Sequence, residues 1–286
     1  MRASVFVPGH ISCIFRPVRH ADVLSTGSLG LGIRLGLGCH ADVSIRDDSR
    51  IRISINGSES EASVTRYALE LMELDTGLDV ALRHDLPLEQ GFGASASGTY
   101  AATLCAASLA GQDLSDAAKA THIAECEKGG GLGDLLAIES PYDVPLRTHP
   151  GCPATVGRTE DTGLRFDSLT MGVFDDPLRT ASVLGDEDSV SRIIGAGDSA
   201  LRMFTSDMSM DNLFRASNMF SEGAELESGE IRDALRAIRG EGYRAGMCML
   251  GNSVFSDASA EVMDGLFDRV YACGSYSGRP EVTRTA

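Results

Sequence analysis

The stretch Gly91-Phe92-Gly93-Ala94-Ser95-Ala96-Ser97 leads into a run of small, mostly apolar residues that continues to Ala110. It predicts a glycine- and serine-rich loop, followed by a helix over about 97–110. That helix is apolar nearly all round, so we expect it to be central and buried. The N–H groups of such a loop and helix start converge on one concave spot, which is anion-binding geometry. A tight helix entry, whose glycines only allow close packing, is the alternative.

Outward from this loop, the periodicity of apolar residues predicts strands first and a mixture of helices and strands later. Strands are expected at Ala3–Val7, Ala41–Ile45, Ile51–Ile55, Leu78–Arg83, Val144–Arg147, Ala154–Val156, Leu169–Phe174, Ala245–Leu250 and Arg269–Cys273. Helices are expected between Glu61 and a stop at Gly77, from a Ser115-Asp116 cap to about Glu127, from near Asp134, and through Val190–Ile194, Leu213–Phe220 and Ile231–Ile238. This order is typical of an α+β protein with its helices segregated from an antiparallel sheet.

Composition narrows the class of protein. The 286 residues are 43% hydrophobic and 23% charged, enough for a large core without disulfides. A net charge of −16 argues against nucleic-acid binding, which needs clustered Lys and Arg. The apolar runs are too short to cross a bilayer, and the first residues lack a signal pattern, so we expect a cytoplasmic protein with no membrane partner. Seven scattered cysteines without a C-x-x-C pair predict reduced thiols.

A second glycine block places an acidic residue directly after a turn, in Gly129-Gly130-Gly131-Leu132-Gly133-Asp134. Together, Glu125, Asp134 and the Ser95 hydroxyl would make a hard oxygen site suited to Mg²⁺. Singly, each acid is more often a solvated helix charge, and Asp134 can be an ordinary N-cap. The sequence contains neither a P-loop nor a G-x-G-x-x-G fingerprint.

Three sequence blocks resemble known family motifs in the order in which they occur along the chain: Pro8-Gly9-His10-Ile11-Ser12, the Gly91–Ser97 loop, and Met249-Leu250-Gly251-Asn252. They follow the three motifs of the GHMP kinase superfamily, and the chain is similar in particular to its archaeal pantoate kinases. Further segments support this resemblance, which spans nearly the whole chain: Ser25-Thr26-Gly27-Ser28-Leu29-Gly30, His122-Ile123-Ala124-Glu125 and Gly131-Leu132-Gly133-Asp134.

The resemblance implies an N-terminal ribosomal-protein-S5-like domain, 1–160, and a C-terminal ferredoxin-like domain, 161–286, with ATP between them. It implies transfer of the γ-phosphoryl of ATP to the primary hydroxyl of (R)-pantoate, giving 4-phosphopantoate in archaeal coenzyme A biosynthesis. A homoserine, shikimate or mevalonate kinase is the rival within the enzyme class, and a non-catalytic metabolite-binding paralogue is the rival outside it. Oligomeric state stays open, with a homodimer as one expectation.

The resemblance also assigns roles to residues. Asp134 is expected to be the base, Ser95 to bind Mg²⁺ or a phosphate, and Glu125 to be the carboxylate ligand, with Glu127 as the fallback. The nucleotide-binding loop is assigned to Gly91, Gly93, Ala94, Ser95, Ala96 and Ser97. The substrate contacts are assigned to His10, Ser28, His122 and Arg147. Arg147 is expected to bind the pantoate carboxylate through two parallel N–H donors.

Overall fold

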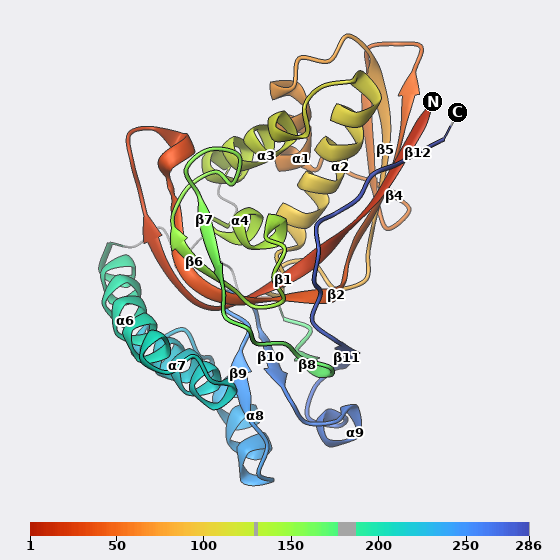
Figure 1. Ribbon diagram of the computed structural model, residues 1–286. Coiled ribbons are helices and arrows are strands. Elements are labelled where there is room, and N and C mark those ends of the chain that lie inside the picture. The colour runs from red at the N-terminus through yellow and green to blue at the C-terminus, as the bar shows by residue number, and fades with distance from the viewer. Residues whose placement is uncertain (129–130, 177–186, 286) are drawn as a thin grey trace.

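A long antiparallel ribbon runs through the computed structural model, which describes residues 1–128, 131–176 and 187–285 (Figure 1). Its strands are β1 (Arg2–Val18) and β2 (Gly27–Arg46), joined through a short 3₁₀ turn, η1 (Val23–Ser25). The sheet order is β12-β1-β2-β5-β3-β4, and β6 and β7 extend it from β2. The remaining strands of this sheet are β3 (Ile51–Ile55), β4 (Ser58–Glu59), β5 (Gly77–His84), β6 (Pro145–His149), β7 (Arg158–Asp161) and β12 (Thr283–Thr285).

Helices cover one face of this sheet (Figure 1). They are α1 (Ser63–Leu71), α2 (Ala94–Ala110), α3 (Leu114–Lys128) and α4 (Asp134–Glu139). The central helix α2 is buried along almost its whole length, because its small side chains let α1, α3 and the sheet approach closely. A hydrophobic core of aliphatic strand residues and helical alanines fills the space between them.

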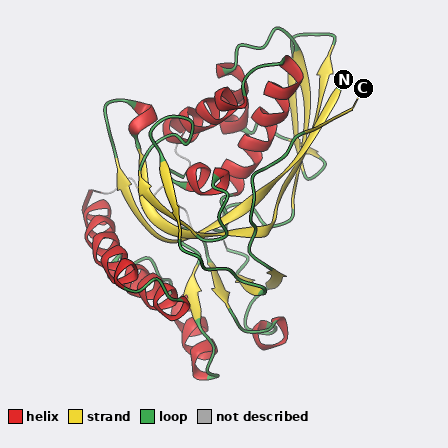
Figure 2. Cartoon of the chain, in the orientation of Figure 1, coloured by secondary structure: helices red, strands yellow, loops and turns green. Residues whose placement is uncertain are grey.

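A second sheet lies on the opposite side of the ribbon, where helices form a separate group (Figure 2). Its order is β11-β8-β10-β9, and every pairing in it is antiparallel. These strands are β8 (Leu169–Val173), β9 (Ala245–Met247), β10 (Ser253–Ser256) and β11 (Arg269–Cys273). The helices of this half are α6 (Glu187–Ser206), α7 (Met210–Gly223), α8 (Gly229–Gly240) and α9 (Ala260–Met263).

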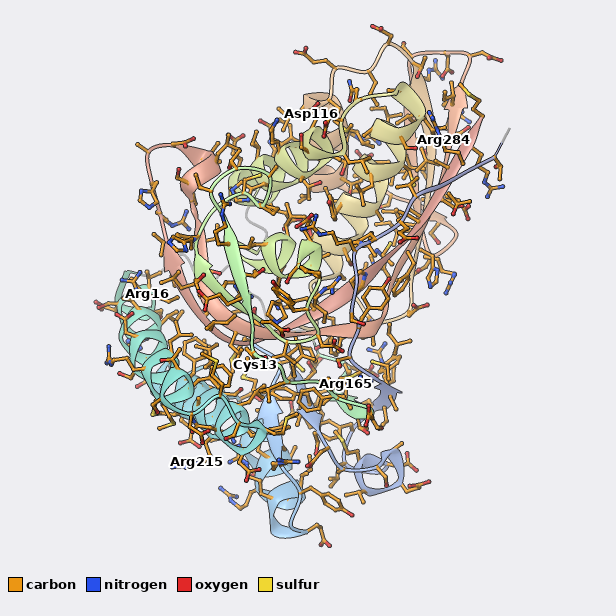
Figure 3. The ribbon with its side chains drawn as sticks, in the orientation of Figure 1. Cys13, Arg16, Asp116, Arg165, Arg215 and Arg284 are labelled. Carbon is orange, nitrogen blue, oxygen red and sulfur yellow. The ribbon has the colours of Figure 1, made fainter. Side chains whose placement is uncertain are left out.

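The ribbon packs against the second half through a hydrophobic cluster that both contribute to. Ile11, Cys13 and Ile33 of the ribbon belong to the same cluster as Phe214 and Phe255 of the second half. Figure 3 shows Cys13 where the ribbon faces that half. The two sheets are therefore joined by packed side chains, and the division of the chain near residue 160 stays a prediction.

The predicted α+β class is confirmed, and most predicted elements are present. Ala154–Val156 is a wrong prediction: it forms a turn, in which the Cys152 carbonyl accepts hydrogen bonds from the N–H groups of Thr155 and Gly157. Gly77 does not end α1, which stops at Leu71, but begins β5. The first strand also runs much further than its alternation predicts.

Pro8 and Gly9 lie inside β1, although this pair is typical of a turn. The strand passes through them because its register with β2 shifts there, from Pro8 opposite Gly38 to Gly9 opposite Leu35. Such a bulge absorbs a residue that cannot donate to the ladder. His10 is thereby carried into the middle of the sheet.

The cysteines are free thiols, as predicted. Within the described ranges, no helix is both long and apolar enough to cross a membrane.

Candidate active site

The three sequence blocks meet in space around the start of α2. The backbone N–H of His10 donates to the Phe92 carbonyl at 2.9 Å, and the N–H of Met249 donates to the Ser12 carbonyl at 3.2 Å. A Cβ at Gly91 would lie 2.9 Å from the Met249 carbonyl oxygen. Strand β1, the glycine loop and the β9–β10 turn therefore touch one another through their backbones.

Gly93 is the N-cap residue of α2, with φ of +61°, and no side chain caps the first turn. This left-handed conformation suits glycine. Because no side chain occupies the cap position, the first N–H groups of a 17-residue helix remain available to an anion. The side chain of Ser97 hydrogen-bonds within the first turn of α2, since its Oγ donates to the Ala94 carbonyl at 3.2 Å.

Ser95 and Glu125 are brought together, as the sequence predicts. Oγ of Ser95 donates to Oε1 of Glu125 at 2.7 Å, and the N–H of Gly131 donates to Oε2 at 3.1 Å. Burial raises the pKa of Glu125 to about 7, despite the hydrogen bond from Ser95. The pair places the hydroxyl of Ser95, an exposed residue at the second position of α2, against the buried carboxylate of Glu125.

Asp134 lies beside the glycine loop at the start of α4. Its Oδ1 is 2.7 Å from Nδ1 of His10, and a Cβ on Gly93 would be 3.5 Å from the same oxygen. Burial alone would raise the pKa of Asp134, but the hydrogen bond from His10 and the charge of Arg147 hold it below its ordinary value. The carboxylate is thus ionised and adjacent to the loop.

Arg147 and Ser28 both adjoin Gly133, the residue directly before Asp134. The guanidinium is buried, with Nη1 at 3.3 Å from Nε2 of His10 and Nη2 donating to the Ile14 carbonyl. Its Nε is buried without a hydrogen-bond partner in the described structure. A Cβ on Gly133 would lie 2.1 Å from Oγ of Ser28 and 2.9 Å from Nε of Arg147, so these two groups adjoin.

Two predicted residues are engaged elsewhere. Nε2 of His122 lies 3.0 Å from the Val23 carbonyl oxygen, and burial lowers the pKa of this histidine. Oε2 of Glu127 accepts a 2.6 Å hydrogen bond from the Tyr67 hydroxyl. Glu125 rather than Glu127 therefore faces Ser95.

Gln90 is a site residue that the sequence analysis missed. Its Nε2 donates to the Phe174 carbonyl, its Oε1 accepts from the N–H of Asn252, and its carbonyl accepts from Oγ of Ser253. These contacts fasten the glycine loop to the second sheet. Its position directly before the loop is the one signal in the sequence, and that signal does not distinguish a packing residue from a loop residue.

No group of three or more His, Cys, Asp or Glu side chains in the described ranges could hold a metal ion by itself. A hollow lined by Arg52, Asp79 and other residues lies along β2, β3 and β5, and it shares no residue with the Asp134 cluster. The cluster combines a helix start without a side-chain cap, an ionised carboxylate and a buried guanidinium. This combination suits the transfer of a phosphoryl group to a hydroxyl on an anionic acceptor.

Comparisons with known proteins agree with this chemistry. The model of the GHMP kinases N terminal domain matches residues 62–140. The pantoate kinase of Thermococcus kodakarensis is 30% identical over 302 residues, covering 99% of this chain and 99% of that protein. The pantoate kinase of Methanospirillum hungatei is 29% identical over 291 residues, covering 98% and 96%.

A solved structure described as a phosphotransferase related to the CoA biosynthesis pathway superposes with a TM-score of 0.88 at 27% identity, covering 99% of each chain. The resemblance seen in the sequence is therefore confirmed, together with the fold that it implied. With a relative 30% identical along its whole length and a matching N-terminal domain, this chain belongs to the GHMP kinase family.

Proposed function

We propose that this GHMP kinase transfers the γ-phosphoryl group of ATP to the primary hydroxyl of (R)-pantoate. The choice of pantoate as the substrate rests on the similarity to pantoate kinases along the full length of the chain. The unpaired Nε of Arg147 beside Ser28 supports it, because a buried N–H donor without a partner in the described structure favours an anionic ligand. Pantoate carries a carboxylate at one end and the hydroxyl at the other.

In phosphoryl transfer the protein mainly positions the reactants and stabilises charge, and it forms no covalent bond to them. The hydroxyl oxygen of pantoate forms a bond to the γ-phosphorus, the bond to the bridging oxygen breaks, and its electron pair leaves with ADP. Asp134 accepts the hydroxyl proton. The N–H groups at the start of α2 hold phosphate oxygens, and Arg147 with Ser28 holds the acceptor carboxylate.

Ser95 and Glu125 are the residues that would hold Mg²⁺. The chemistry of this pair fits: both groups offer oxygen, and in the described structure Glu125 is a buried carboxylate without a basic partner. Proteins hold Mg²⁺ through one or two carboxylates together with the phosphates of the substrate. When bound, the ion would offset charge on the phosphates.

A panel of acceptors tests the proposal. ADP release from ATP is measured with pantoate, homoserine, shikimate and mevalonate, at equal enzyme and magnesium concentrations. We expect stimulation by pantoate above the other three. Stimulation by another acceptor alone would reject the substrate, and nucleotide binding without turnover on any acceptor would favour a metabolite-binding role.

A further inference from the structure

His10 is enclosed between two charged groups and has no access to solvent. The ring is 0% exposed on β1, with Nδ1 at 2.7 Å from Oδ1 of Asp134 and Nε2 at 3.3 Å from Nη1 of Arg147. A Cβ on Gly32 would lie 2.0 Å from Nε2, so the glycine in β2 leaves the room that the ring fills. The ring is therefore fixed in one orientation.

The neighbours of the ring determine where its proton lies. A guanidinium has only donors, so Nε2 must accept from Arg147. The ring proton then sits on Nδ1 and is donated to Asp134. Burial lowers the pKa of His10, the charges of Arg147 and Arg34 lower it further, and only Asp134 opposes them. The imidazole is neutral near pH 7.

This hydrogen bond occupies one oxygen of Asp134 and leaves the other. In the described residues, no hydrogen bond involves Oδ2, which lies against the backbone at Gly131, where a Cβ would be 1.8 Å away. Because Oδ1 is held by His10, Oδ2 is the oxygen that can receive a proton from an acceptor hydroxyl.

We infer that His10 is a positioning residue, whose neutral Nδ1–H tautomer, fixed by Arg147, orients Asp134 and keeps it ionised for proton transfer. This inference rests on the proposed function of Asp134. The acceptor hydroxyl proton moves to Oδ2, while the His10 proton stays on Nδ1 throughout. His10 therefore does not bind the substrate, unlike the role that the resemblance assigns to it.

Three substitutions separate this role from simple packing. His10→Asn keeps an amide donor near the position of Nδ1, His10→Gln moves its amide towards the position of Nε2, and His10→Leu has no donor. We expect Gln and Leu to lower kcat by about tenfold or more, a part of the roughly 10²- to 10⁴-fold contribution of a general base. In both of these variants, the acid limb of the profile of kcat against pH should move to higher pH, because Asp134 loses the donor that lowers its pKa.

The His10→Asn variant should keep the acid limb near its wild-type position. The Asp134→Asn variant should lower turnover by at least as much as His10→Leu does. Equal shifts in all three His10 variants, or no shift in any, would overturn the inference. Thermal unfolding and active-site titration correct each rate for misfolded protein.

The tautomer is measured independently of activity, from the imidazole ¹⁵N shifts of the wild-type protein labelled at its histidines, with His10→Asn assigning the signal. Protonation at Nδ1 alone is expected at and around pH 7. Protonation at Nε2, or at both nitrogens, would reject the inference. If pantoate proves not to be the acceptor, this measurement still decides the state of His10, so the two failures are distinguishable.

Discussion

The backbone at Gly133, directly before Asp134, runs against the side chains of Ser28 and Arg147. We expect Gly133→Ala to displace Ser28 and Arg147, because the added methyl group would lie 2.1 Å and 2.9 Å from their polar atoms. The KM for the hydroxy acid should rise several-fold or more, while the Kd for ATP changes less. Steady-state kinetics and nucleotide titration measure both.

Gly195→Ala is the matched control. Gly195 lies within α6, and a Cβ built there meets nothing within 4 Å. Alanine should stabilise the protein by about 0.5–1 kcal/mol at this helical position without altering the kinetics. Equal kinetics for Gly133→Ala and the wild type would contradict the placement of Ser28 and Arg147 beside the acceptor.

Ser95 and Glu125 share one hydrogen bond, so their substitutions should not act independently. Ser95→Ala and Glu125→Gln should each raise the magnesium concentration needed for half-maximal turnover and lower kcat. The double variant should lose less than the product of the two single losses. Magnesium titrations of turnover at saturating ATP measure these effects.

Glu127→Gln is the control for this pair, because Glu127 follows Glu125 closely on α3 and contacts Tyr67 instead. Its magnesium midpoint should equal that of the wild type. A shifted midpoint in Glu127→Gln, with unshifted midpoints in the Ser95 and Glu125 variants, would assign the metal to the fallback residue.

Among the elements, Gln90 links the glycine loop to the segment after β8 and to the β9–β10 turn. We expect Gln90→Ala to lower the free energy of unfolding by about 1–3 kcal/mol, since buried polar partners at Phe174 and Asn252 are left unpaired. The Kd for ATP should rise as well, because the loop loses its attachment. Urea unfolding and ATP titration give the two values.

Gln112→Ala provides the comparison, because Gln112 donates one hydrogen bond to the Met72 carbonyl, away from the loop. It should change stability without changing the affinity for ATP. If both glutamine variants bind ATP like the wild type, the loop does not depend on this attachment.

Across the whole molecule, the C-terminal segment returns from the second sheet and adds β12 to the edge of β1 (Figure 1). Arg34, buried in β2, holds this segment: Nη1 donates to the Tyr142 and Tyr276 carbonyls, and Nη2 donates to the Gly278 carbonyl. One side chain therefore joins the ribbon, the segment after α4, and the C-terminal segment.

Arg34→Met should lower the free energy of unfolding by about 3 kcal/mol or more, because several carbonyl groups lose their donor at once. Arg236→Met removes an exposed ion pair with Asp233. This variant should change the free energy of unfolding by less than about 1 kcal/mol. Urea unfolding of both variants measures the difference. Similar midpoints would show that the carbonyl groups find other donors.

Local patterns in the chain located most of the helices and several of the strands, and they indicated the family. Period-two alternation located β3 at Ile51–Ile55, and the small apolar residues after the glycine loop located the buried helix α2. These patterns are local, because each strand or helix must present apolar side chains at its own period to reach a core. The order of three motifs was also visible without coordinates.

Which side chains meet could be read only from the folded chain. His10 and Asp134 are 124 residues apart, and Arg147 is 137 residues from His10, so no local period records their contact. Glu125 and Glu127 point about 160° apart around the axis of one helix, and the packing of α3 against α2 selects Glu125. Local patterning specifies the elements, whereas contacts between distant segments depend on how those elements pack.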